Sequence, residues 1–481
     1  MSTRPPVIVW FRQDLRLADN PALAAAAETG QPVLPLFILD EETPDVRPLG
    51  GASRWWLHHS LESLAAGLRD HGLQPSLHRG AAADVLAEVV KQTGTDRVVW
   101  NRCYEPGAIA RDTAVKAMLK DAGVAAESFN GSLLIEPWRI ETSQGGPYKV
   151  FTPYWRRLRE LYKAPPLAVL PKKLPAAEPQ SGNTLDAWAL LPTEPDWAGG
   201  LRETWEVGEG AAMARLGDFL DNGLACYPQE RDRPYIAGTS RLSPHLHWGE
   251  IGPHQIWRAA AAYLDRGGAV AAGAEALLRE LAWRDFNNHL LFHFPGIATS
   301  NWREQFDVFT WRDDPDALAL WQRGQTGFPL VDAGMRELWH TGFMHNRVRM
   351  ITGSFLVKDL MIDWRLGEAW FWDTLVDADL ANNAGNWQWV AGSGADASPF
   401  FRIFNPVTQG EKFDPAGTYV RRWVPELSEL PQKWIHKPWA ASPEILDAAA
   451  VRLGENYPAP MVDHGVARDR ALEAYQTIRG N

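Results

Sequence analysis

Short apolar runs alternate with amphipathic runs over the first 130 residues. The apolar runs hold β-branched residues, as expected of buried strands, and the amphipathic runs have the 3.6-residue period of helices. The first helix is predicted to begin at Asn20-Pro21, where a proline occupies the first turn. The predicted strands are 7–11, 32–39, 75–78, 98–100 and 125–129, and the later helices are 54–69, 83–91 and 109–119. This βαβα order predicts a Rossmann-like or flavodoxin-like α/β domain with a parallel sheet, over residues 1–132.

The rest of the chain changes character twice. Residues 163–200 are dense in proline, and we predict that 133–207 form an interdomain linker. Residues 208–481 show helical periodicity and no β-rich stretch, which predicts an all-α second domain. The predicted helices of this domain include 210–222, 253–265, 272–291, 331–340, 344–362, 366–376 and 466–479.

Composition narrows the class of protein. A chain of 481 residues exceeds one ordinary domain, so two are expected. Two cysteines, Cys103 and Cys226, exclude a disulfide scaffold and a cysteine-ligated iron–sulfur cluster, which needs about four thiolates. No apolar run reaches the roughly 18 residues of a membrane span, and the N-terminus shows no signal-peptide core. We therefore expect a cytoplasmic protein without a membrane partner.

Charge and aromatic content leave the partner open. The net charge of −11 argues mildly against nucleic acid, but local patches decide such binding. Scattered arginines also form ordinary solvated surfaces, and most of the 24 tryptophans are expected in the core. The arginines of interest lie in the C-terminal half, often beside aromatics: Arg231, Arg233, Arg241, Arg284, Arg347, Arg349, Arg402, Arg421 and Arg422.

The most informative segment is D-A-D-L-A-N-N-A-G-N-W-Q-W at 377–389. Its two carboxylates can bind a sugar hydroxyl or a ring N–H, and an amide can meet a ring nitrogen that changes protonation. Its indoles can exchange electrons with the same ring. A packing segment does not need this mixture, whereas a flavin site does, so the segment predicts a flavin cofactor.

Three shorter groups favour the same ligand. The loop Gly238–Pro244 offers hydroxyls and an arginine at a helix start, which suits a diphosphate, although a simple Ser/Thr N-cap has the same pattern. Glu280, Trp283 and Arg284 share one helix face, which suits an aromatic substrate or, more plainly, a local Glu–Arg pair.

The third group places a positive charge near the ring. Asn346, Arg349 and Met350 share a face of another helix, where Arg349, held by Asp377, would balance the charge of a reduced flavin.

Together these segments resemble the photolyase/cryptochrome family over nearly the whole chain. The matching blocks are V-I-V-W-F-R-Q-D-L-R-L-A-D-N-P-A-L at 7–23, G-T-S-R-L-S-P-H-L at 238–246, E-L-A-W-R-D-F at 280–286, T-G-F-M-H-N-R-V-R-M at 341–350, the 377–389 segment, and F-F-R-I-F-N-P-V-T-Q-G-E-K-F-D at 400–414. The resemblance implies an α/β antenna domain followed by an α-helical domain that binds FAD.

The resemblance also implies roles for single residues. The implied FAD contacts are Tyr227, Thr239, Ser240, Leu242, Ser243, Asn346, Arg349, Asp377, Asp379 and Asn383. The implied electron relay is Trp387, Trp364 and Trp311. The implied pocket for a cyclobutane pyrimidine dimer is Glu280, Trp283, Met350 and Trp389, and we expect Arg231, Arg347 and Arg402 to contact UV-damaged DNA.

The subtype follows from what stands at a few family positions. Repair enzymes for (6-4) lesions carry histidines where this chain has Asn346 and Met350, which favours cyclobutane dimers. Plant cryptochromes usually carry Asp at the position facing the flavin, where this chain has Asn383 as photolyases do. The chain is most similar to bacterial class III photolyases, through P-L-G-G-A-S-R-W-W-L-H-H-S-L at 48–61 and W-V-A-G-S-G-A-D-A-S-P-F-F-R at 389–402.

The class III resemblance implies a 5,10-methenyltetrahydrofolate antenna. Class I enzymes hold their folate with an Asn-Glu pair, where this chain reads Gly107-Ala108. A folate is then either held by other residues, with Glu105 as the candidate, or absent.

The expected activity is light-driven repair of the dimer by electron transfer from excited, reduced FAD to a dimer flipped out of the duplex. We expect Glu280 to steady the dimer, and we expect a monomer. Two alternatives stay open at this point. One is a blue-light receptor that binds FAD without repair, which Asn383, Glu280 and the lack of a long C-terminal extension disfavour. The other is a flavoprotein that binds single-stranded nucleic acid whether damaged or not.

Overall fold

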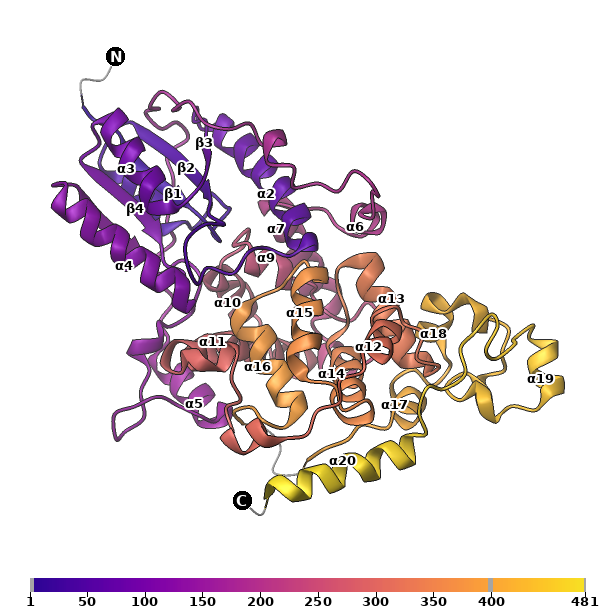
Figure 1. Cartoon of the computed structure of the whole chain (residues 1–481). Helices are drawn as coiled ribbons and strands as arrows, with labels where there is room; N and C mark the ends of the chain where they lie inside the picture. Colours follow the sequence, from indigo (N-terminus) through magenta and orange to yellow (C-terminus); the bar gives the residue numbers. More distant parts are fainter. Residues whose placement is uncertain (1–3, 397–400, 480–481) are drawn as a thin grey trace. The chain divides into compact units, whose positions relative to one another are not determined.

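The computed structural model describes residues 4–396 and 401–479 (Figure 1). Residues 1–3 of the N-terminal segment and residues 397–400, which belong to the 389–402 motif, lie outside the described residues. The chain forms two compact units. Unit 1 contains 1–198, 205–225 and 240–295, and unit 2 contains 199–204, 226–239 and 296–481.

Unit 1 begins with the predicted parallel sheet, whose strands run in the order β3-β2-β1-β4-β5. The strands are β1 (Val7–Phe11), β2 (Val33–Leu39), β3 (Ser76–Arg79), β4 (Arg97–Asn101) and β5 (Ala125–Phe129). All four pairings are parallel, so each connection crosses over through a helix. Each strand lies within one residue of its prediction. The buried central strands β1, β2 and β4 read as apolar runs, whereas the edge strands β3 and β5 are partly exposed.

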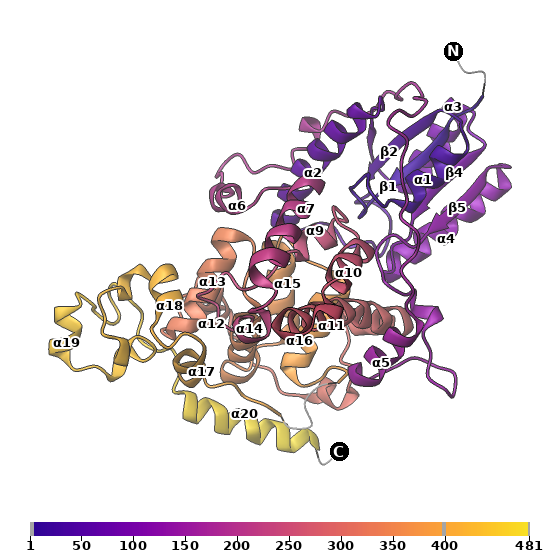
Figure 2. The ribbon, with the colours of Figure 1, turned by 180° about the vertical axis from the view of Figure 1, so that it is seen from behind.

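Helices cover both faces of this sheet. On one face, Leu86 and Val115 pack against Ile8 and Val98 in a single buried cluster. On the opposite face lies α1, which is drawn in front of the strands in Figure 2. The four helices are α1 (Pro21–Glu28), α2 (Gly51–Asp70), α3 (Ala82–Thr93) and α4 (Pro106–Asp121). The predicted doubly covered sheet is confirmed.

Two of the remaining helices of unit 1, α5 (Phe151–Leu161) and α10 (Pro253–Ala261), pack against one long helix. That helix, α11 (Gly268–His293), places Trp283 face to face with Phe151 of α5, with ring centroids 3.6 Å apart. The others are α7 (Glu209–Asp218) and α9 (Ser243–His247). The domain boundaries at 132 and 207 stay a prediction.

Unit 2 is helical, and no strand beyond an isolated bridge occurs among its described residues. Its helices are α6 (Gly199–Thr204), α8 (Tyr227–Glu230), α12 (Pro315–Gln322), α13 (Pro329–Thr341), α14 (Asn346–Ser354), α15 (Trp364–Thr374), α16 (Leu380–Ala391), α17 (Pro406–Phe413), α18 (Thr418–Trp423), α19 (Pro443–Ala448) and α20 (His464–Arg479). One apolar core holds Trp321, Trp364 and Trp387 together. The predicted all-α half is confirmed.

Two predicted helices end in a π-helical turn rather than continuing. α7 runs into Phe219–Gly223, and α14 runs into Phe355–Asp359. The second turn buries Asp359, which contacts His464 of α20 at 2.5 Å and accepts from Arg470 through its backbone carbonyl at 2.6 Å. Single π-helical turns are frequent at functional sites. Here the turn fixes the C-terminal helix to the core of unit 2.

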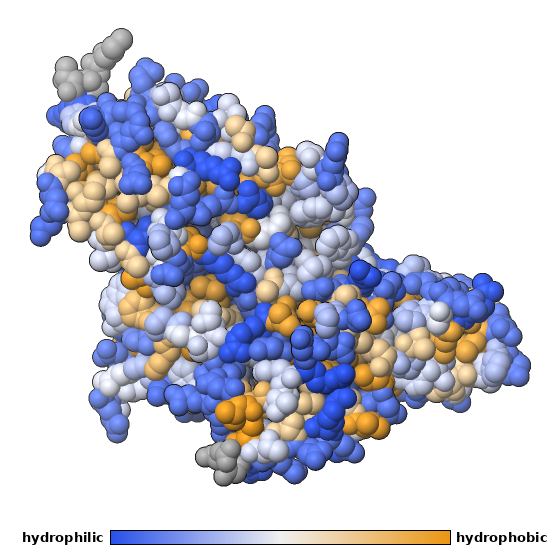
Figure 3. Space-filling model, viewed as in Figure 1, coloured by the Kyte–Doolittle hydropathy of each residue, from blue (hydrophilic) through white to orange (hydrophobic). Residues whose placement is uncertain are grey.

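None of the helices in the described parts of the chain is long and apolar enough to span a bilayer. On the face seen in Figure 3, hydrophilic residues interrupt the apolar surface. The exposed large apolar side chains include Trp339 and Leu366.

Candidate functional site

Asn383 is buried in α16 with its side-chain amide oriented by one partner. The amide nitrogen donates to the backbone carbonyl of Glu368 at 3.0 Å and to the Glu368 carboxylate at 2.8 Å. The reverse orientation would set the amide oxygen against a carboxylate, so the orientation is physically determined. Hydrogen bonds to a charged acceptor are worth about 1.5–3 kcal/mol, enough to hold the amide in place. The amide oxygen is thereby left as the acceptor for a ligand.

Arg349 is held from two sides. Its Nη2 donates to both carboxylate oxygens of Asp377, at 3.0 and 3.1 Å, and its Nε donates to the backbone carbonyl of Met344 at 2.7 Å. The predicted Arg349–Asp377 pair therefore exists. Asp377 is nearly buried whereas Arg349 keeps a quarter of its side chain exposed. A fixed, half-exposed cation of this kind can face an anionic ligand.

The neighbouring polar residues lie at the starts of helices. Asp379 is the N-cap of α16 and accepts from the backbone and side-chain nitrogens of Asn382, at 2.8 and 2.7 Å. Asn346 is the exposed first residue of α14. Tyr227 is buried at the start of α8. The structure thus places Asp377, Asp379, Asn383 and Arg349 on elements of one unit.

The hydroxyl-rich loop leads into a helix as predicted, but that helix is short. α9 covers only Ser243–His247, so its dipole is small and an anion there would depend on N–H and hydroxyl donors. Arg241 has a positive φ of 51° and lies over the ring of Trp205. Leu242 is buried, whereas Ser240 is partly exposed and Ser243 exposed. Thr239 belongs to unit 2.

The three predicted residues of α11 have different surroundings. Arg284 donates to the backbone carbonyls of Ser132 and Leu246, at 2.6 and 3.5 Å, so its guanidinium serves the packing of unit 1. Trp283 has one ring face covered by Phe151 and keeps partial exposure. Glu280 is partly exposed one turn earlier.

One buried carboxyl next to this trio, that of Asp285, received no role from the sequence. Asp285 accepts from the backbone nitrogens of Leu134 and Ile135, at 2.7 and 3.2 Å. Burial raises its pKa to about 7. No sequence signal separates Asp285 from a surface residue of an amphipathic helix.

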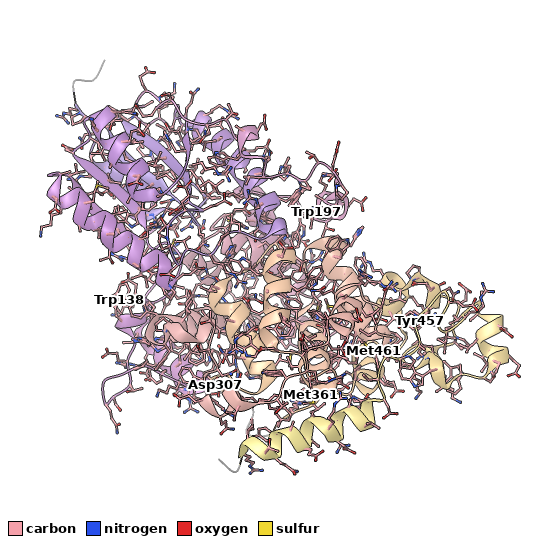
Figure 4. All side chains as sticks on the ribbon, in the orientation of Figure 1. Trp138, Trp197, Asp307, Met361, Tyr457 and Met461 are labelled. Atoms are coloured by element: carbon pink, nitrogen blue, oxygen red, sulfur yellow. The ribbon has the colours of Figure 1, made fainter. Side chains whose placement is uncertain are left out.

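The three relay tryptophans share one hydrophobic region. Trp364 and Trp387 are buried in the same core, and Trp311 packs at its partly exposed edge. The indole N–H of Trp364 donates to Asn301 at 3.0 Å, and Asn301 in turn donates to Asp307 at 2.7 Å (Asp307 is labelled in Figure 4). The indole nitrogen of Trp387 is buried without a hydrogen-bond partner. The two inner indoles therefore differ in polarity.

The predicted DNA contacts lie on the surface or close to it. Arg347 pairs with Asp232 at 2.7 Å, lies over Phe413 and has its Nη1 3.9 Å from the sulfur of Met350. Arg402 is exposed over the ring of Phe404. The third predicted DNA contact, Arg231, is partly exposed, and so are Met350 and Trp389 of the predicted dimer pocket.

Comparison with known proteins identifies the family. Residues 7–176 match the model described as DNA photolyase, and residues 277–477 match the FAD binding domain of DNA photolyase. A deoxyribodipyrimidine photo-lyase of Agrobacterium fabrum is 53% identical over 477 residues, 98% of each chain. The chain belongs to the photolyase/cryptochrome family.

Relatives from both branches of the family are similar along the whole chain. Cryptochrome-2 of Arabidopsis thaliana is 38% identical over 98% of this chain and 79% of that protein. The crystal structure of a bacterial class III photolyase from Agrobacterium tumefaciens has a TM-score of 0.96 at 52% identity, covering 100% of this chain and 99% of that one. The predicted family and fold class are confirmed.

Within this family fold, the carboxyl edge of the sheet is lined with charge. Arg12, after β1, donates to both carboxylate oxygens of Asp112, at 3.1 and 3.2 Å. Arg111 reaches Asp40, after β2, at 3.5 Å. Glu105 is the N-cap of α4, directly after β4. Ligands of open parallel sheets bind at this edge, where the strand order reverses between β1 and β4.

Position 107 leaves no room for a side chain. A Cβ built on Gly107 would lie 2.1 Å from the backbone oxygen of Asp45. This chain has Gly107-Ala108 where class I enzymes have an Asn-Glu pair. At this position the loop that contains Asp45 packs directly against α4.

Proposed function

We propose that this protein is a deoxyribodipyrimidine photolyase, which uses light and FAD to repair cyclobutane pyrimidine dimers in DNA. The observation that carries the proposal is the full-length match, 98% of each chain at 53% identity, to a deoxyribodipyrimidine photo-lyase. The class III photolyase structure supports it with nearly complete coverage of both chains. The product is the pair of separate pyrimidines, formed by cleavage of the carbon–carbon bonds of the cyclobutane ring.

FAD is held in this proposal by residues whose donors and acceptors match its parts. The oriented amide oxygen of Asn383 accepts from a ring N–H, and Arg349 balances negative charge on the ring. When bound and reduced, FAD supplies the light-driven electron. The full proposed set is Tyr227, Thr239, Ser240, Leu242, Ser243, Asn346, Arg349, Asp377, Asp379 and Asn383.

The damaged bases are bound by polar and aromatic side chains. Glu280 hydrogen-bonds the polar edge of the dimer, and Trp283, Met350 and Trp389 supply apolar contacts. A dimer pairs and stacks poorly, so extruding it costs less than extruding a normal base, roughly a few kcal/mol, and photolyases are known base flippers. Arg231, Arg347 and Arg402 bind phosphates of the damaged strand.

The relay tryptophans re-reduce the cofactor in this proposal. A hydrogen-bond acceptor at an indole N–H stabilises the oxidised, cationic ring. Trp364 has such an acceptor in Asn301, whereas Trp387 has none. Positive charge created on Trp387 therefore moves favourably to Trp364, and from there to the partly exposed Trp311.

An antenna, 5,10-methenyltetrahydrofolate, is proposed to bind at the carboxyl edge of the sheet. The reversal of strand order between β1 and β4 supports that position, and Glu105 follows β4 directly. The close approach of Asp45 to Gly107 argues against the class I arrangement. A monomer in the cytoplasm stays the prediction for assembly and location.

A blue-light receptor is the second candidate, supported by the 38% identity to Cryptochrome-2. The test uses reduced protein with an oligonucleotide carrying one thymine cyclobutane dimer, under blue light and in darkness. Light-dependent recovery of thymine absorbance supports the photolyase. No recovery by protein that binds FAD and is reduced by light would favour the receptor. Equal affinity for undamaged strands, without recovery, would favour a single-strand binding flavoprotein.

A further inference from the structure

Two histidines and a glutamate of α2 lie close together. His58, His59 and Glu62 offer donor atoms that lie within 4.8 Å of one another. Among the residues that the structure describes, this is the one group of three such side chains close enough to share a metal ion. All three lie on one helix of unit 1, apart in sequence from every residue assigned above to FAD or DNA.

The spacing on the helix explains the convergence. Glu62 is four residues after His58 and three after His59, so its carboxylate is next to both rings. One carboxylate oxygen lies 2.8 Å from Nδ1 of His59, and the other lies 3.6 Å from Nε2 of His58. Ligand atoms about 2.0–2.2 Å from a tetrahedral zinc are separated by about 3.3 Å. The two observed separations bracket that value.

The rings are held by their surroundings rather than by the carboxylate alone. The His58 side chain is only 6% exposed, and its ring lies 5.2 Å from that of His59. Trp55 meets the His59 ring edge-on, 4.7 Å between centroids. Both imidazoles are therefore partly oriented before any ligand binds, which lowers the ordering cost of binding.

The electrostatics suit a cation. A neutral imidazole carries the lone pair that a metal requires. The exposed Glu62 adds a negative charge beside both rings. Two imidazoles and a carboxylate match Zn²⁺ and its transition-metal neighbours, whereas Mg²⁺ and Ca²⁺ prefer oxygen ligands.

We propose that His58, His59 and Glu62 form a zinc-type transition-metal site on α2, with water completing the coordination. A single Glu–His hydrogen bond uses one ring nitrogen, whereas here two imidazoles face one carboxylate. The metal replaces the proton shared between Glu62 and His59, and it links two successive turns of the helix. The site requires no change at the flavin residues.

The test is a titration of protein without any histidine tag, first treated with a chelator. Zn²⁺ binding is followed by calorimetry, and Co²⁺ binding by its visible absorption. We expect one equivalent of metal. His59→Gln and Glu62→Gln, both on exposed or half-exposed side chains, should each weaken binding at least about tenfold, because loss of even a residue that only supports a metal ligand costs ~10–100-fold. His71→Gln, at the end of the same helix, is the matched control and should bind as the parent does.

Two results would overturn the proposal. One is the absence of saturable binding, and the other is equal affinity in His59→Gln, Glu62→Gln and the parent. A thiolate-to-cobalt absorption band would place the metal at the exposed Cys226, and it would also overturn the proposal. Unchanged flavin absorbance and unfolding transitions of the variants show that they are folded. The result is independent of repair activity.

Discussion

Asn383 gives both hydrogens of its side-chain amide to a single residue, Glu368, one to the backbone carbonyl and one to the carboxylate. The two residues lie on neighbouring helices, α16 and α15. The pair thus couples a buried negative charge to the amide proposed to meet the flavin.

Replacing Glu368 by Gln is expected to raise the reduction potential of bound FAD. Removing a buried negative charge makes electron uptake by the flavin more favourable. At an effective dielectric constant of about 20 and a charge-to-flavin distance of roughly 16 Å, the gain is about 1 kcal/mol. This energy corresponds to ~20 mV for a two-electron couple. Redox titration against dye standards measures the shift. Glu473→Gln, an exposed site on α20, serves as control. A reduction potential equal to that of the parent would show that the charge of Glu368 does not act on the flavin.

Glu280→Ala is expected to lower the quantum yield of repair about tenfold or more. A hydrogen bond to a charged group is worth about 1.5–3 kcal/mol, and 1.36 kcal/mol corresponds to a factor of ten. Flavin content should not change. Glu275→Ala on the same helix removes a surface pair with Arg159 and is the matched control. An undiminished yield would remove Glu280 from the substrate site.

Trp311→Phe is expected to slow or abolish reduction of FAD by light, while repair by chemically reduced protein continues. Phenylalanine keeps the packing against Phe309 but is much harder to oxidise. Flavin absorbance under blue light with an external reductant gives the rate. Trp339→Phe, at a 55% exposed position, is the control. Full-rate reduction in Trp311→Phe would mean that another tryptophan delivers the electron.

Asp285→Asn is expected to flatten the dependence of stability on pH. The folded state raises the pKa of Asp285 from 3.8 to about 7 through burial. Its contribution is therefore complete below about pH 4 and is lost progressively as the pH rises through about 7, on the order of 4 kcal/mol in all. Urea unfolding at pH 5 and pH 8 measures the difference, with the exposed Asp121→Asn as control. Identical pH profiles of parent and variant would contradict the raised pKa.

Gly367→Ala is expected to destabilise unit 2 by about 1–3 kcal/mol, the usual cost of overpacking. A Cβ at this position would lie 2.2 Å from Trp387 and 2.6 Å from Leu356. The control is Gly217→Ala in α7, where nothing lies within 4 Å, and there the better helix propensity of alanine should stabilise by up to ~1 kcal/mol. Denaturant unfolding compares the two. Equal behaviour would mean that the Trp387 ring moves at little cost.

The sequence predicted those parts of the fold that depend on local pattern. The central strands β1, β2 and β4 were predictable because burial on both faces requires apolar runs. α5 was missed although Phe151, Tyr154, Trp155 and Leu158 have helical spacing, because the segment lies in the stretch predicted as a linker. The π-helical turn at Phe355–Asp359 was missed because a change of hydrogen-bond register leaves no mark on periodicity.

The site shows the same division. Arg349 and Asp377 were predicted as a pair from chemistry alone, and the pair exists. Glu368 was not singled out, because its contact with Asn383 depends on how α15 packs against α16. Arg284 shares a helix face with Glu280, yet it donates to backbone carbonyls brought near only by folding.

The contact between Gly107 and the backbone of Asp45 has a consequence for protein engineering. Placing asparagine at position 107, in order to graft a class I folate site, would force its Cβ against a peptide group. A peptide group cannot move aside by changing a side-chain rotamer. Such a graft must rebuild the loop around Asp45 in the same step. Exchange of light-harvesting specificity at this position is therefore a two-segment redesign, and single-site libraries at 107 would return only glycine.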